Sequence, residues 1–144
     1  MQTRQQEKME ALRREILCLQ GLSVPMSCGQ TAVPLGPVLE NMPGRVFPTG
    51  AIHELLSHTA PASAAMSGFM AAIMNSLLQG GKYGLWISTQ RTLFPPALKA
   101  FGLDPERMIF VDVQKETEAF WTMEEALKCD ALGAVVAEIK ELDF

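Results

Sequence analysis

The chain has 144 residues, of which 48% are apolar and 19% are charged, and its net charge at pH 7 is −4. This composition is typical of one globular domain with a core and excludes a disordered tail. Lys and Arg do not cluster with aromatic residues, so we expect no direct nucleic-acid binding. The sequence has neither a stretch able to span a bilayer nor the apolar core of a secretion signal, which predicts no membrane contact and a cytoplasmic location.

The three cysteines, Cys18, Cys28 and Cys129, give an odd count and no C-x-x-C spacing. Both a disulfide framework and a structural zinc site need paired cysteines at suitable spacings. We therefore predict reduced thiols and no metal site.

An amphipathic helix is predicted over residues 3–20, ended by Gly21, and residues 1–21 form the first region. Its apolar positions are spaced by three, four and three residues and lie on one narrow stripe, formed by Met9, Leu12, Ile16 and Leu19. Two interpretations are open: the stripe packs on the chain's own domain, or it binds a partner protein. The second makes these four residues the candidate partner-binding site.

Residues 22–50 form a second region, which contains five prolines and four glycines. Such a density is incompatible with long helices and central strands. We expect this region to be a linker that tethers the first helix to the region 51–144.

The region 51–144 alternates between strand and helix patterns. Strands are predicted at 51–57, 83–88, 108–113 and 133–139, and helices at 63–79, 96–101 and 116–129. This order predicts an α/β fold with a mostly parallel sheet flanked by helices. Trp86 and Trp121 are expected to fill the layer between sheet and helices.

The stretch HTAPASAAMS (58–67) lies between the first predicted strand and the helix after it, where many α/β proteins carry a phosphate-binding loop. A working loop reads G-x-x-x-x-G-K-[ST]. The run from Glu54 to Glu138, with the Gly81–Lys82 pair and GLDPER (102–107), resembles the core of the RecA recombinase family. The resemblance implies a RecA-like fold.

Aligned with that family, the loop has lost its phosphate-binding residues. The two glycines fall on Ala60 and Ala65, the lysine on Met66 and the hydroxyl residue on Ser67. The family's catalytic glutamate falls on Gln90 and its magnesium-binding acid on Glu138. Since methionine cannot bind phosphate by a charged hydrogen bond and an amide cannot act as a base, we expect no ATP hydrolysis, no cofactor and no catalytic residue. Asp112, near the end of another apolar strand, is either a polar remnant of the old site or, as we favour, a residue that caps a loop.

Three stretches resemble the ImuA family of RecA-like error-prone repair proteins: ALRREILCLQG (11–21), FPTGAIHELLS (47–57) and KCDALGAVVAEI (128–139). This resemblance implies a non-catalytic protein of SOS-induced mutagenesis and translesion synthesis, which binds or recruits RecA and an ImuB-like, Y-family polymerase homologue. Self-association is compatible with it. Because the family usually continues beyond the position of Phe144, we expect the core to be truncated at its carboxyl end.

Two other functions fit parts of the sequence. WISTQRTLFPPALKAFGL (86–103) also fits SulA, a cell-division inhibitor that acts on FtsZ, although the 11–21 and 47–57 stretches favour ImuA. An enzyme would use a Ser–His pair drawn from His53 and His58 with nearby hydroxyls, namely Ser57, Thr59, Ser63 and Ser67. No G-x-S-x-G elbow accompanies them, and hydroxyls at a helix start usually cap it.

Overall fold

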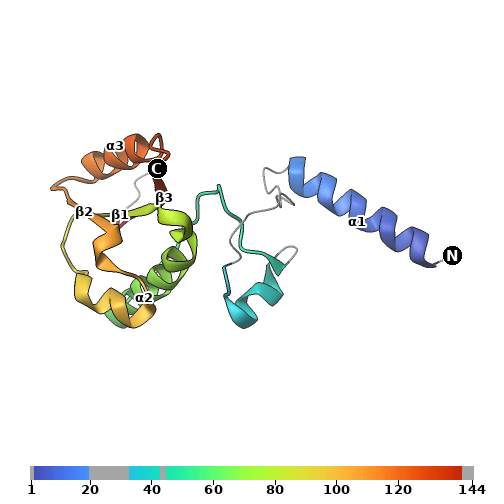
Figure 1. Cartoon of the computed structure of the whole chain (residues 1–144), viewed down its shortest axis with the longest axis horizontal. Coiled ribbons are helices and arrows are strands. Elements are labelled where there is room, and N and C mark those ends of the chain that lie inside the picture. The colour runs from blue at the N-terminus through green and yellow to red at the C-terminus, as the bar shows by residue number, and fades with distance from the viewer. Residues whose placement is uncertain (1, 20–32, 43–44, 141–144) are drawn as a thin grey trace. The chain divides into compact units, whose positions relative to one another are not determined.

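The computed structural model describes residues 2–19, 33–42 and 45–140 (Figure 1). The chain divides into two compact units, Met1–Glu54 and Leu55–Phe144. Within the described ranges, no helix is both long enough and apolar enough to cross a membrane.

The first unit contains helix α1 (Gln2–Leu19) and the short 3-10 helix η1 (Gly36–Asn41). Helix α1 confirms the helix predicted for 3–20, whereas its predicted end at Gly21 lies outside the described residues. The ring of Phe47 is buried and stacks on His53 with a centroid distance of 4.4 Å. The described part of the Pro/Gly-rich region contains η1 but no strand.

The second unit is built on a sheet of three parallel strands in the order β2-β1-β3. Strand β1 (Tyr83–Ser88) is central, and β2 (Met108–Asp112) and β3 (Leu132–Ala137) pair with its two sides. All three confirm predicted strands: β1 has the predicted bounds, and the ends of β2 and β3 differ from the prediction by at most two residues. The apolar run YGLWIS forms β1 because a central strand covered on both faces needs apolar side chains on both.

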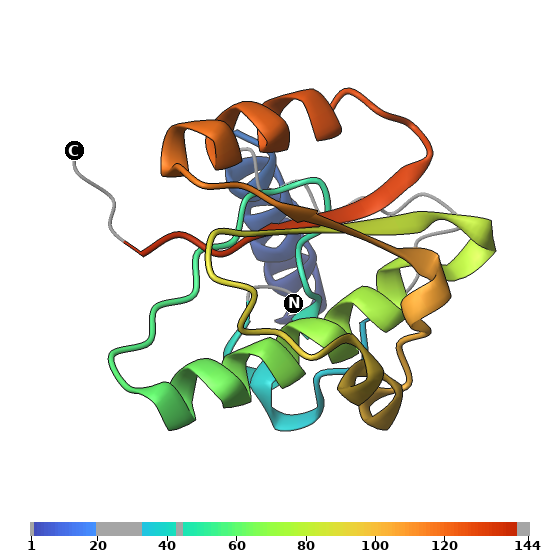
Figure 2. The ribbon, with the colours of Figure 1, turned by 90° about the vertical axis from the view of Figure 1, so that its left-hand side faces the viewer.

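Helices cover both faces of the sheet (Figure 2). Helix α2 (Ala60–Leu77) lies on one face, followed by the 3-10 turn η3 (Gln79–Gly81). Two further 3-10 helices, η4 (Pro95–Phe101) and η5 (Pro105–Arg107), join β1 to β2, and η4 packs on α2. Helix α3 (Glu116–Ala126) covers the other face. The predicted class, an α/β fold with a parallel sheet flanked by helices, is therefore confirmed, although the helix expected at 96–101 is a 3-10 helix.

The core consists of two layers that share β1. Trp86 points toward α2, whereas Leu85 and Ile87 point toward α3, as the alternation of a strand requires. The layer on the α2 side contains Ala71, Met74, Leu78, Trp86, Leu98, Leu103 and Met108. The layer on the α3 side contains Leu85, Ile87, Ala119 and Ala126.

The strand predicted at 51–57 does not form in the structure. These residues have no strand pairing, and two of the three large apolar side chains of the segment, Ile52 and Leu56, are 89% and 74% exposed. His53 bonds locally instead, with its Nε2 2.8 Å from the carbonyl oxygen of Pro48. A short apolar alternation becomes a strand only when a neighbour supplies hydrogen bonds and a face to bury, and this segment has neither. The prediction was wrong for this reason.

The two tryptophans differ in their environment. Trp86 is 2% exposed inside the α2 layer, as expected. Trp121 is 65% exposed on α3 and does not fill the sheet–helix layer. Its helix uses the small Ala119 and Ala126 on the sheet-facing side, so Trp121 lies on another face.

Candidate functional site

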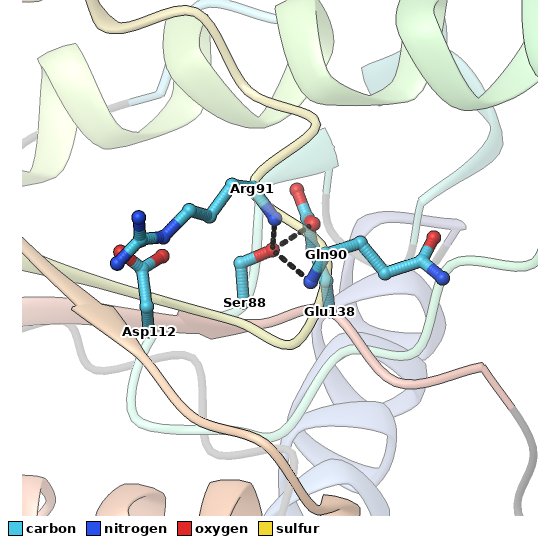
Figure 3. A network of polar contacts seen from close by, with 5 residues as sticks. All are labelled: Ser88, Gln90, Arg91, Asp112 and Glu138. Carbon is cyan, nitrogen blue, oxygen red and sulfur yellow. Dashed lines mark hydrogen bonds and ion pairs between the residues drawn. The ribbon is translucent and has the colours of Figure 1, made fainter.

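The carboxyl ends of the parallel strands meet at one edge of the sheet, where ligands of α/β proteins usually bind. A cluster of polar residues lies there (Figure 3). Ser88 ends β1, Asp112 ends β2 and Glu138 directly follows β3. The loop after β1 adds Gln90, Arg91 and Thr92.

The carboxylate of Glu138 accepts three side-chain hydrogen bonds. The indole Nε1 of Trp86 donates to Oε1 at 2.9 Å. The hydroxyl of Ser88 donates to Oε2 at 2.7 Å, and that of Thr92 donates to the same oxygen at 3.2 Å. Both oxygens of the carboxylate therefore accept hydrogen bonds from the same chain. Two of the three donor residues, Trp86 and Ser88, are buried.

Ser88 connects this carboxylate to the loop after β1. Its side chain is buried, and its Oγ accepts the backbone N–H groups of Gln90 at 3.2 Å and Arg91 at 3.1 Å. A serine hydroxyl has one proton to donate and two lone pairs. The bonds to Glu138, Gln90 and Arg91 use all three, so Ser88 fixes the start of the loop.

Arg91 has a positive φ of +53°, a conformation that costs a residue with a side chain about 1–2 kcal/mol. Two contacts hold it there: the hydrogen bond from its N–H to Ser88 and an ion pair of its Nε with Asp112 Oδ2 at 2.6 Å. The arginine side chain is 76% exposed, so the ion pair alone contributes up to about 1 kcal/mol. The Ser88 bond must therefore supply part of the compensation.

The site predicted from sequence is brought together in part. Glu138 and Gln90 both lie at this edge, joined through Ser88. However, the side chain of Gln90 is exposed and extends away from the contact between Ser88 and Glu138 (Figure 3). Sequence reasoning missed Ser88 and Thr92, although a serine that ends the otherwise apolar run YGLWIS was a usable signal for Ser88.

The phosphate-loop positions lie in a helix, not in a loop. Helix α2 begins at Ala60, three residues earlier than predicted, and Thr59 caps it by accepting the N–H of Ala62 at 3.3 Å. Ala65 and Met66 lie within α2, and the hydroxyl of Ser67 donates to the carbonyl oxygen of Ser63 at 3.1 Å. The N–H of Ala62 is taken by the Thr59 side chain, and from Ser63 onward the N–H groups bond to carbonyl oxygens four residues earlier, so these groups are not available to cradle a phosphate.

Two of the four hydroxyls of the Ser–His alternative are used locally. Thr59 caps α2, and Ser67 bonds to the backbone of Ser63. His53 stacks on Phe47 within the first unit, while His58 is exposed in the second. Local hydrogen bonding of this kind is usual for hydroxyl residues at the start of a helix.

The candidate partner-binding stripe lies on α1. Met9 is 60% exposed, Leu12 51% and Ile16 50%. The side chain of Leu19 lies outside the described residues. Three large apolar side chains at helical spacing are therefore exposed on one face of this helix.

In the described part of the chain, no three His, Cys, Asp or Glu side chains lie close enough together to hold a metal ion. Cys129 is an exposed free thiol. The other two cysteines are not covered, because the side chain of Cys18 and the whole of Cys28 lie outside what the structure describes.

Together, these features define a three-layer α/β unit. The carboxylate that follows its last strand, Glu138, accepts hydrogen bonds from side chains of the same chain. The chain is 30% identical over 106 residues to Protein ImuA of Caulobacter vibrioides, in strain NA1000 / CB15N and in strain ATCC 19089 / CIP 103742 / CB 15. The alignment covers 71% of this chain but 43% of each of those proteins, so the chain spans less than half their length. No family model matches the chain, and no solved structure matches it significantly.

Proposed function

We propose that this chain is an ImuA-like, RecA-like protein without nucleotide chemistry, which acts by binding other proteins of the DNA-damage mutagenesis machinery. The observation that carries the proposal is that side chains of the same chain already donate hydrogen bonds to both oxygens of the Glu138 carboxylate. At the strand edge where a magnesium–nucleotide complex would bind, this carboxylate accepts hydrogen bonds from Trp86, Ser88 and Thr92. A magnesium ion would have to compete with these three donors for the lone pairs of the carboxylate.

The start of α2 supports the same proposal. A phosphate loop needs several N–H groups turned toward the ligand and a lysine that reaches the terminal phosphates. Here the corresponding residues from Ala60 to Ser67 are helical, and Met66 stands at the lysine position. On this proposal the chain is not an enzyme and carries no cofactor.

The proposed partners are RecA and an ImuB-like, Y-family polymerase homologue, bound in the cytoplasm through α1. The exposure of Met9, Leu12 and Ile16 supports the interpretation of the stripe as a docking surface. Burial of such a stripe contributes a few kcal/mol at about 25 cal/mol per Å², before the cost of association. We therefore expect micromolar affinity if α1 acts alone.

The test is affinity capture of the tagged chain from DNA-damaged cells of its own source, with the captured proteins identified by mass spectrometry. The double variant Leu12→Asp/Ile16→Asp places two charges on the stripe. The control Gln6→Asp/Ala11→Asp adds the same charge to α1 away from the stripe. We expect RecA and a Y-family polymerase homologue to be captured by the wild type and the control, and to be lost with the stripe variant.

Two outcomes would contradict this proposal. Capture of FtsZ in place of RecA and the polymerase homologue would make the chain a SulA-like division inhibitor. Equal capture by the stripe variant would exclude α1 as the anchor. Independently, an ATP titration with magnesium up to about 1 mM should show no binding, and saturable binding would overturn the absence of nucleotide chemistry.

A further inference from the structure

The loop after β1 crosses the carboxyl edge of the sheet as a short segment, residues 89–92, which we call the strap. Both of its ends are fixed by packing. Ser88 before it is 4% exposed, and Leu93 after it packs against the core layer on the α2 side. Three of the four strap residues are exposed, namely Gln90, Arg91 and Thr92. The position of the strap therefore depends on its polar contacts more than on packing.

The strand ends on both sides of the strap are joined to β1 by backbone hydrogen bonds. The N–H of Val113, which follows Asp112, donates to the carbonyl oxygen of Ser88 at 3.1 Å. The N–H of Glu138 donates to the carbonyl oxygen of Ile87 at 2.9 Å. These bonds hold the two acidic residues in place beside the strap. The acids are thus fixed anchors, and the strap is the part of this edge that can move locally.

Polar contacts hold the strap from both neighbouring strands. On the β3 side, the hydroxyl of Thr92 donates to Glu138 at 3.2 Å. Ser88, which also donates to Glu138, accepts the backbone N–H of Arg91 at 3.1 Å. On the β2 side, the Nε of Arg91 lies 2.6 Å from Asp112 Oδ2. Figure 3 shows the side chain of Arg91 extending toward Asp112 while its backbone N–H meets Ser88, so this one residue joins the two sets of contacts.

Arg91 makes these contacts in the left-handed backbone region, with φ +53°. This region is unfavourable for a residue with a Cβ atom but not for glycine. The ion pair that opposes the strain is exposed, at 76% for the arginine side chain and 38% for the aspartate. Such a pair is weak and is screened by salt. Little free energy therefore separates the strained conformation of the strap from a relaxed one.

We propose that the strap is a latch at the strand edge, which the Arg91–Asp112 pair keeps closed. When the pair is broken, the backbone at Arg91 relaxes to negative φ and its N–H leaves Ser88. The lone pairs of the Ser88 hydroxyl then become available to other donors. An anion that competes with Asp112 for the guanidinium opens the latch in this way. The latch is independent of the partners proposed for α1.

The experiment is amide hydrogen exchange of the purified chain, followed by NMR. The readout is the N–H of Gln90, which also donates to Ser88, at 3.2 Å. Arg91→Ala and Asp112→Ala each remove the pair and should each lower the protection factor of this N–H about fivefold, the most that an exposed pair supplies. The double variant should lower it by the same factor and not by about 25-fold, because both changes remove one pair. Raising NaCl from about 0.05 M to about 1 M should lower it in the wild type and leave the double variant unchanged.

Arg91→Gly is the matched control. It also removes the pair, but glycine adopts positive φ without strain, so its protection factor should stay closer to that of the wild type than the factor of Arg91→Ala. The indole N–H of Trp86, which donates to Glu138, should keep its protection in every variant. Circular dichroism checks that each variant is folded.

Four results would overturn the proposal. Wild-type protection of Gln90 in both single variants would show that the pair does not hold the strap. Multiplied losses in the double variant would show that Arg91 and Asp112 act separately. Equal losses in Arg91→Ala and Arg91→Gly would show that the pair opposes no strain. A matching loss at the Trp86 indole would show that the whole strand edge loosens, and not the strap alone.

Discussion

Removal of the Glu138 carboxylate is the most direct test of the strand-edge cluster. In Glu138→Ala, the indole N–H of Trp86 and the hydroxyl of Ser88 lose their acceptor, and both residues are buried, at 2% and 4% exposure. A buried donor left without a partner costs about 1–3 kcal/mol. Thr92 is exposed and can bond to water instead. We therefore expect a loss of about 3 kcal/mol in the free energy of unfolding, a large part of the total for a small domain.

The amide variant separates hydrogen bonding from packing. In Glu138→Gln, one oxygen can still accept from Trp86, but the amide NH₂ then faces Ser88. The two lone pairs of Ser88 already accept the N–H groups of Gln90 and Arg91, so the amide meets a donor instead of an acceptor. We expect an intermediate loss of about 1–2 kcal/mol.

Urea unfolding followed by circular dichroism and tryptophan fluorescence measures these losses, since both tryptophans lie in the second unit. Glu106→Ala, at an exposed position away from the strand edge, is the matched control and should change stability by less than about 0.5 kcal/mol. If Glu138→Ala lost no more than this control, Glu138 would not be the acceptor that satisfies Trp86 and Ser88. The argument that internal hydrogen bonds keep this carboxylate from binding magnesium would then fail.

Two further predictions concern the backbone and the surface. Gly102 has φ +79°, and an added Cβ would lie 2.9 Å from Asn75 Nδ2, whereas Gly80 has φ +77° with open space around it. Gly80→Ala should therefore lower the free energy of unfolding, measured in urea, by about 1 kcal/mol, and Gly102→Ala should lower it measurably more. Equal losses would show that the contact with Asn75 has no effect on stability. Hydrogen bonding to Glu125, and then to Glu124, raises the pKa of Lys128 above its ordinary value of 10.5. Its stabilising effect is present below that value and is lost as the pH rises through the higher pKa of the folded state. The difference in Tm between wild type and Lys128→Met should therefore persist below pH 10.5 and shrink as the pH is raised above it.

Local patterns in the sequence were sufficient for most of the second unit. The strand YGLWIS could be predicted because its apolar run is bounded by glycines and polar residues, and α3 because its apolar positions recur at helical spacing. The segment 51–57 has an equally good local pattern but no strand pairing. Whether a strand forms depends on a neighbour with a free edge and a face to bury, which is a property of the tertiary structure and not of seven residues.

The strand-edge cluster shows the same limit at the level of a single side chain. Sequence reasoning could place an acidic residue, Glu138, just after a buried strand, where a carboxylate can serve either as a metal ligand or as a hydrogen-bond acceptor. The choice between these roles depends on donors that lie 46 to 52 residues away along the chain, Thr92, Ser88 and Trp86. Because these three satisfy both carboxylate oxygens, the position keeps the residue type of a metal site while the surrounding contacts favour a structural role. An acidic residue at this edge is therefore weak evidence for metal binding until its donors have been identified.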